Sequence, residues 1–122
     1  MHRRLRAPFY LVLAFLLTGG VHAQESSAAK SDLLEGHRLA LLICSACHSV
    51  SADQPDPPIL RPPALSFRSI SKKPGATEQS LHSFILTTHS TVKMPFNMLN
   101  PQLDDDQAAA IVAYILSLKG RH

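Results

Sequence analysis

The chain has 122 residues, of which 45% are hydrophobic and 17% charged, with 2 cysteines and a formal net charge of +3 at pH 7. This length is sufficient for one small domain with a modest core. The positive charge does not indicate a nucleic-acid partner, because three of the basic residues lie in a leader at the N-terminus.

Residues 1–23 are predicted to form a secretory signal peptide. Arg3, Arg4 and Arg6 precede an apolar run at 9–17, and Val21-His22-Ala23 supplies small residues where a signal peptidase cleaves. The run is short for a membrane span. Cleavage would leave 9 basic and 9 acidic residues, a formally neutral chain. We therefore expect a periplasmic protein without stable membrane insertion, and the alternative is an uncleaved leader that serves as an anchor.

Residues 24–31 are small and polar and are predicted to form a flexible tail, followed by a domain over 32–122. Asp32 is the expected N-cap of a first helix, and Glu35 completes a capping box. Glycine in a helix interior costs about 1 kcal/mol relative to alanine. Gly36 therefore indicates that another helix approaches closely.

The sequence Cys44-Ser45-Ala46-Cys47-His48 follows this helix. Two cysteines separated by two residues and followed by histidine form the attachment sequence of c-type haem. Each thiol adds across a porphyrin vinyl group to give a thioether, and the next residue then lies under the iron. We predict that Cys44 and Cys47 hold one haem and that His48 is its proximal axial ligand.

Paired cysteines also occur in other kinds of site. A thioredoxin-like dithiol requires a βαβ pattern, and no strand pattern precedes the motif. A zinc site requires further ligands at close spacing, but the chain has no other cysteine and its histidines are scattered. A disulfide across two residues would be strained. A thiol redox protein or a zinc protein is therefore the alternative to haem attachment.

The segment 51–63 contains five prolines and is predicted to be a loop, because proline prevents helix and discourages sheet. A metal-ligating histidine usually donates its second ring N–H to a fixed acceptor. A proline carbonyl in this loop could accept that hydrogen bond from His48, and we select Pro63. A short helical turn over 65–71 follows.

Thr77 is the expected N-cap of the next helix, which runs to about residue 88 with Leu81, Phe84 and Ile85 on one face. The last helix has the clearest signals. Asp104 and Gln107 form a capping box, and an apolar face follows at Ala108, Ile111, Val112, Ile115 and Leu118.

Lys93-Met94-Pro95-Phe96 lies between these two helices. Proline stops any helix and leaves Met94 on a loop, where a thioether can reach an iron. We predict Met94 as the distal axial ligand. Met98, His89 and an open site are the alternatives.

These residues together resemble the small monohaem c-type cytochromes that are ligated by histidine and methionine. The resemblance rests on Gly36 to Ala40 before the haem motif, on Met94-Pro95, and on the ending Ile111 to Leu118. It implies an all-α, cytochrome c-like fold with about three main helices around one covalently bound haem. It also implies crossing of the first and last helices near Gly36 and Tyr114. One departure is Arg61-Pro62-Pro63, where the family often has Gly-Pro.

His/Met ligation raises the reduction potential of haem iron, and the chain shows no acid–base pair or nucleophile. We therefore expect an electron carrier rather than an enzyme. Its partners would be redox proteins such as a dehydrogenase, an oxidase or another cytochrome, and not nucleic acid; it would be a monomer or a subunit of a complex. A haem-based gas sensor and a cytochrome subunit of a periplasmic dehydrogenase are the alternatives.

Overall fold

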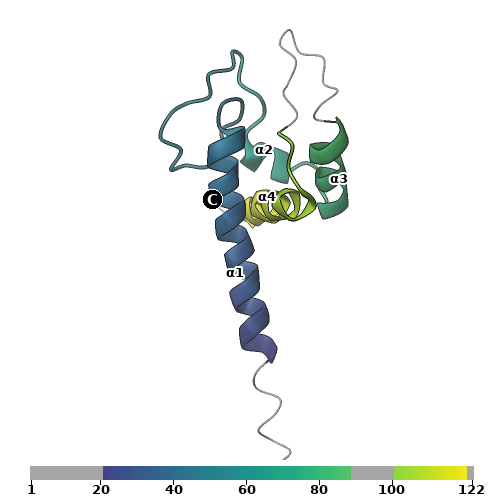
Figure 1. Ribbon diagram of the computed structural model, residues 1–122. Helices are drawn as coiled ribbons and strands as arrows, with labels where there is room; N and C mark the ends of the chain where they lie inside the picture. Colours follow the sequence, from purple (N-terminus) through teal and green to yellow (C-terminus); the bar gives the residue numbers. More distant parts are fainter. Residues whose placement is uncertain (1–20, 89–100, 121–122) are drawn as a thin grey trace, which may run out of the picture.

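The computed structural model describes residues 21–88 and 101–120, and helices are the main secondary structure of this part of the chain (Figure 1). The main helices are α1 (Val21–Leu39), α3 (Glu78–Ser83) and α4 (Asp105–Ser117), and a short helix α2 (Phe67–Ser71) precedes α3. The described residues contain no β-strand and only one isolated parallel bridge, which pairs His48 with Ala64. The predicted all-α class with three main helices is confirmed.

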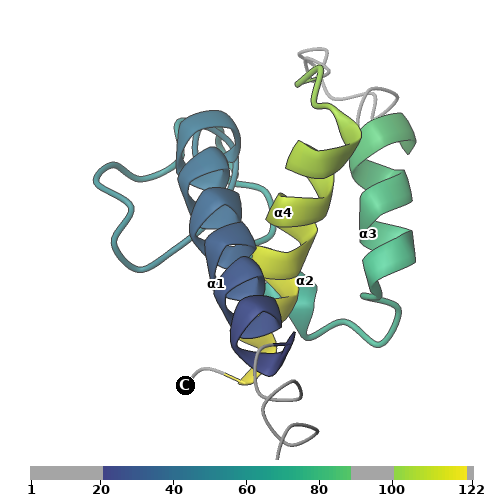
Figure 2. The ribbon, with the colours of Figure 1, turned by 60° about the horizontal axis from the view of Figure 1, so that its bottom comes forward.

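Helix α4 lies between α1 and α3, as both views of the ribbon show (Figures 1 and 2). Its start follows the sequence prediction. The Asp104 carboxylate accepts a hydrogen bond from the Gln107 backbone N–H, and the Gln107 side-chain oxygen accepts one from the Asp104 backbone N–H. The predicted cap of α3 is also confirmed, because Thr77 accepts a hydrogen bond from the Ser80 backbone. These caps satisfy N–H groups that have no partner within the helix.

Helices α1 and α4 cross with their backbones almost in contact. A Cβ atom on Gly36 would lie 2.0 Å from the carbonyl oxygen of Ala110 and 2.9 Å from the Cβ atom of Tyr114. Only glycine fits this crossing, because such distances are far below van der Waals contact. The close approach predicted from Gly36 is therefore confirmed, and Tyr114 lies at the same crossing.

The hydrophobic core lies where α1, α2 and α4 meet. Its buried members come from α1 and the turn that follows it, the segment after the cysteine motif, α2, and α4 with the turn that follows it: Leu39, Ala40, Val50, Phe67, Ile111, Tyr114, Ile115 and Leu118. Leu81 and Ile85 of the third predicted helix pack against this cluster. Phe84, expected on the same face, is 42% exposed. A π turn, Phe84–Thr88, replaces the expected α-helix there, and the wider turn changes the direction of the side chains that follow.

Helix α1 begins at Val21 and therefore includes residues 24–31. The prediction of a flexible tail over 24–31, with Asp32 as the first N-cap, is wrong. No proline or glycine interrupts the chain between Val21 and Glu35, and its alanine, serine, lysine and glutamate residues tolerate helix. Residues 27–32 are exposed and make this end of α1 an arm outside the core (Figure 1).

The predicted signal peptide falls mostly on residues 1–20, which lie outside the described residues, so it stays a prediction. None of the helices within residues 21–88 and 101–120 combines the length and the apolar composition of a membrane span.

Candidate functional site

The cysteine–histidine motif begins in the π turn that ends the first helical segment. Ala40–Cys44 adopts this π turn directly after α1, and the hydroxyl of Ser45 donates to the carbonyl of Leu41 at 2.6 Å. The backbone N–H groups of Cys47 and His48 both donate to the carbonyl of Cys44, at 3.1 and 2.9 Å. These two hydrogen bonds close a tight turn over the motif, from Cys44 to His48.

The proline-rich loop holds the motif through backbone hydrogen bonds. The N–H groups of Ile59 and Leu60 donate to the Ala46 carbonyl, at 2.9 and 3.2 Å. The N–H of Ala64 donates to the Cys47 carbonyl at 2.9 Å. The loop predicted from the sequence therefore packs beside the motif and forms part of the site.

One ring nitrogen of His48 donates a hydrogen bond to the backbone just after the proline-rich loop. Its Nδ1 lies 2.7 Å from the carbonyl oxygen of Leu65. A carbonyl only accepts hydrogen bonds, so Nδ1 carries the proton and Nε2 of the neutral ring carries the lone pair. This is the tautomer that a histidine needs in order to ligate a metal through Nε2.

The prediction that the Pro63 carbonyl would accept this hydrogen bond is wrong. The parallel bridge between His48 and Ala64 sets the register of the loop against the motif. In this register Leu65, two residues after Pro63, presents its carbonyl to the ring. The sequence could not identify Leu65 as the acceptor, because every residue type has the same backbone carbonyl.

The imidazole of His48 also contacts the core. Its ring centroid lies 5.5 Å from that of Phe67, with a tilt of 54°. Phe67 is buried, and its backbone N–H donates to the Ser49 carbonyl at 3.0 Å. The Tyr114 hydroxyl donates to the Val50 carbonyl at 3.1 Å. Helices α2 and α4 therefore fix the chain just after the motif.

The two cysteines are free thiols and are half-buried. Burial, followed by the nearby Cys47, raises the pKa of Cys44 to about 11. Reactive thiols in dithiol enzymes have depressed pKa values instead. Within the described ranges, no group of three or more His, Cys, Asp or Glu side chains could hold a metal ion. The raised pKa of Cys44 therefore does not favour the thiol redox alternative.

The residues of this site fit a covalently attached haem. Two thiols and a histidine with an oriented ring lie on one segment, and the adjacent loop carries large apolar side chains on its surface. Ile59 is 80% exposed and Leu65 is 53% exposed. An apolar porphyrin plate is the kind of partner that such side chains can cover and that the donor set can hold.

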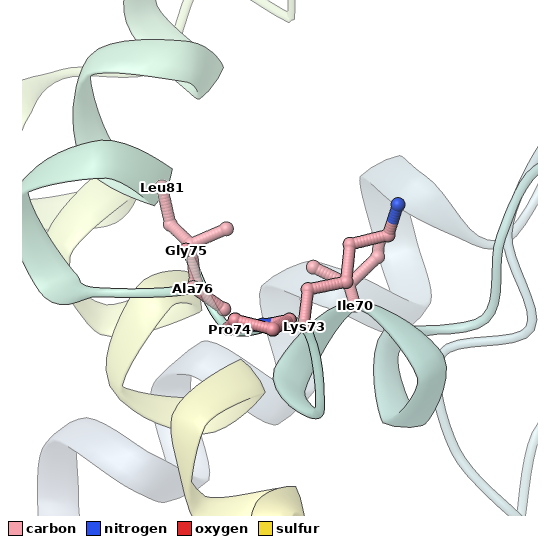
Figure 3. Close-up of a pocket in the computed structure, with 6 residues that line it drawn as sticks. All are labelled: Ile70, Lys73, Pro74, Gly75, Ala76 and Leu81. Atoms are coloured by element: carbon pink, nitrogen blue, oxygen red, sulfur yellow. The ribbon is translucent and has the colours of Figure 1, made fainter.

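A separate open pocket of about 460 Å³ lies between α2 and α3 (Figure 3). It is lined by Ile70, Lys73, Pro74, Gly75, Ala76 and Leu81. None of these residues belongs to the cysteine–histidine motif or to the loop that holds it, so this pocket is not part of the predicted site.

The predicted distal ligand, Met94, lies outside the described residues, as do the alternatives Met98 and His89. The structure therefore describes the proximal half of the predicted site, with Cys44, Cys47 and His48, and its methionine ligand stays a prediction.

A comparison with protein-family models matches residues 33–119 to the family described as cytochrome c. The matched range begins in α1 and ends just after α4, and it includes the whole cysteine–histidine motif. The comparisons with curated proteins and with solved structures gave no match.

Proposed function

The chain belongs to the cytochrome c family, and on this premise we propose that it is a periplasmic electron carrier that holds one haem through Cys44 and Cys47. The orientation of His48 carries the proposal. A ring whose Nδ1 lies 2.7 Å from a backbone carbonyl oxygen, and donates its proton to it, is already in the form that ligates iron through Nε2.

The residues of the site have separate roles in this proposal. The sulfur atoms of Cys44 and Cys47 would hold the haem to the chain, and His48 would ligate its iron. The Leu65 carbonyl fixes the tautomer and the plane of the imidazole. Met94 is proposed as the distal ligand because Pro95 keeps it out of a helix.

When bound, the haem supplies an iron that alternates between Fe(III) and Fe(II) and so takes up and releases one electron. The protein's contribution is to keep the proximal ligand fixed during both states. The hydrogen bond from His48 to Leu65 and the contact with Phe67 restrain the ring in its plane and in its tilt. Restrained ligands require little rearrangement when the charge changes, which favours rapid electron exchange with a partner protein.

Export to the periplasm is part of the proposal and rests on the leader in residues 1–23. Helix α1 runs across the predicted cleavage position after Ala23, and this observation favours a second candidate in which the leader stays attached as an anchor. The intact mass of the exported protein separates the two, because cleavage removes residues 1–23.

A potentiometric titration followed by absorption spectroscopy tests the electron-carrier function. We expect a reversible one-electron transition and no binding of carbon monoxide to the reduced protein, because His48 and the proposed ligand Met94 would leave no free position on the iron. Tight carbon monoxide binding would favour the gas-sensor alternative. A protein without any reversible transition would contradict the proposal.

Replacement of Met94 tests the distal ligand separately. In Met94→Ala the spectral features of methionine ligation should disappear and the reduction potential should fall, because methionine ligation raises it. Met98→Ala is the matched control and should keep the wild-type spectrum. If the two variants exchange these results, Met98 is the ligand.

A further inference from the structure

The side chain of Gln54 connects the haem motif, the residues just after it and the loop to which Gln54 itself belongs. Its Oε1 accepts a hydrogen bond from the Val50 backbone N–H at 2.9 Å. Its Nε2 donates to the carbonyls of Ser45 and Asp56, at 3.3 and 2.6 Å. One carboxamide therefore contacts the backbone between the two cysteines, the backbone just after His48, and its own loop.

The backbone hydrogen bonds of the motif show why this contact matters. The carbonyls of Cys44, Ala46, Cys47 and Ser49 all accept from backbone N–H groups. The Ser45 carbonyl instead accepts from the Gln54 side chain. The polar groups of a partly buried segment need partners, and Gln54 provides one on each side of His48.

Gln54 is itself held in place. It is partly buried, and the short bond to Asp56 fixes its Nε2. The adjacent residue Asp53 accepts from His37 of α1 at 3.1 Å, and Val50 accepts from Tyr114 of α4 at 3.1 Å. The carboxamide therefore connects the motif to the α1–α4 crossing as well as to the loop.

We propose that Gln54 is a positioning residue, whose carboxamide holds the segment Ser45–Val50 so that His48 keeps its orientation toward the iron. This inference rests on the proposed function, because it assigns the role within the haem site. Gln54 does not touch the imidazole itself; it acts by fixing the backbone on both sides of it.

The consequence for the iron follows from the hydrogen bond of His48. Donation from Nδ1 to a carbonyl raises the basicity of a metal-ligating imidazole. A more basic ligand favours Fe(III) over Fe(II) and lowers the reduction potential. If the segment loosens and the bond to Leu65 weakens, the reduction potential should rise.

The test compares Gln54→Met with Gln79→Met in the haem-loaded full chain. Methionine keeps the length and the unbranched shape of glutamine but removes both donors and the acceptor. Gln79 is an exposed glutamine on α3, so its variant controls for the generic effect of the exchange. The measurements are hydrogen exchange at the backbone N–H of Val50 and at Nδ1–H of His48, together with the reduction potential.

In Gln54→Met we expect exchange at both groups to accelerate by about tenfold, which corresponds to about 1.4 kcal/mol, and the potential to rise. Amides in the middle of α4 should keep their wild-type rates. A third variant, Gln54→Glu, keeps an acceptor for the Val50 N–H but loses both donors. It should protect Val50 better than Gln54→Met does, while the His48 ring still exchanges faster than in the wild type.

Two results would overturn the inference. One is that Gln54→Met and Gln79→Met show the same rate of hydrogen exchange at Nδ1–H of His48 and the same reduction potential. The other is that every core amide accelerates equally, which indicates general destabilisation. Neither result affects the proposed function, which fails only if the wild-type chain carries no haem or shows no reversible one-electron transition.

Discussion

The crossing of α1 with α4 and the segment Ser45–Val50, which contains most of the cysteine–histidine motif, are held together in different ways. At the crossing, backbone meets backbone, and a single added carbon at Gly36 would lie 2.0 Å from Ala110. The segment Ser45–Val50 is instead held by individual hydrogen bonds from the loop and from Gln54. Packing determines the first region, and directional polar contacts determine the second.

This difference suits the roles of the two regions. Packed helices form a rigid frame, because close-packed interiors do not deform continuously. The motif must accept a large apolar group and still keep His48 in one orientation, so it is restrained by hydrogen bonds and not by a filled core. Val50 connects the two regions, since its side chain is buried in the core and its backbone is hydrogen-bonded to both Tyr114 and Gln54.

The largest expected effect comes from removing the attachment itself. In the double variant Cys44→Ala and Cys47→Ala, no haem should be bound covalently, because no thiol is left to form a thioether. Mass spectrometry after denaturation measures this directly. Covalent haem in the double variant would show that the attachment does not use these cysteines.

The next largest effect is expected at the helix crossing. Gly36→Ala should lower the free energy of unfolding by about 3 kcal/mol, because the new methyl group can fit only if the two helices move apart. Gly75→Ala is the matched control, since a Cβ atom there meets nothing within 4 Å, and it should change stability by less than about 0.5 kcal/mol. Denaturant unfolding measures both variants. Equal stabilities would contradict the close crossing.

Tyr114→Phe tests the contact that joins the two regions. It keeps the ring, which lies 4.9 Å from the His37 ring, but removes the hydroxyl that donates to the buried Val50 carbonyl. We expect a loss of about 1–2 kcal/mol in the free energy of unfolding, because the carbonyl stays buried without this donor. A loss of several kcal/mol would mean that the hydroxyl has a larger role than one hydrogen bond.

The smallest effect concerns the ion pair between α1 and the loop. The nearby Ser51 hydroxyl, ahead of the backbone N–H and His37, lowers the pKa of Asp53 from its ordinary value of 3.8. A carboxyl with a lowered pKa stabilises the fold above its unfolded pKa, and this contribution is lost as the pH falls through the folded value.

Stability of the wild type should therefore decrease from about pH 4 downward more steeply than that of Asp53→Asn. Thermal unfolding between pH 2 and pH 6, about the range in which carboxyl groups titrate, measures the difference. Asp56→Asn changes an exposed carboxylate of the same loop and serves as control. Parallel pH profiles for the wild type and Asp53→Asn would contradict the lowered pKa of Asp53.

The two regions also differ in how far the sequence predicts them. The helix frame follows from local signals: the caps at Thr77 and Asp104 and the glycine at the crossing are confirmed. The predicted start of α1 was wrong, because residues 24–31 lack a strong signal for either a helix or a tail. The π turns were missed, since hydrophobic periodicity does not distinguish them from α-helix.

In the second region, the motif identified Cys44, Cys47 and His48 as site residues. The groups that hold these residues in place were not predicted. Leu65 acts through its backbone carbonyl, so its side chain carries no information about that role. The register set by Ala64 and Cys47 depends on the path of a loop with five prolines, and no local pattern specifies that path. The side-chain contacts of Gln54 likewise require the three-dimensional structure.

The central claim is that one haem is bound covalently through Cys44 and Cys47 in the full chain. The most direct measurement is the intact mass under denaturing conditions of protein exported from a host that matures c-type cytochromes. We predict the mass of the polypeptide plus one haem, with no free thiol. Polypeptide mass alone, with two thiols that react with an alkylating reagent, would contradict the account.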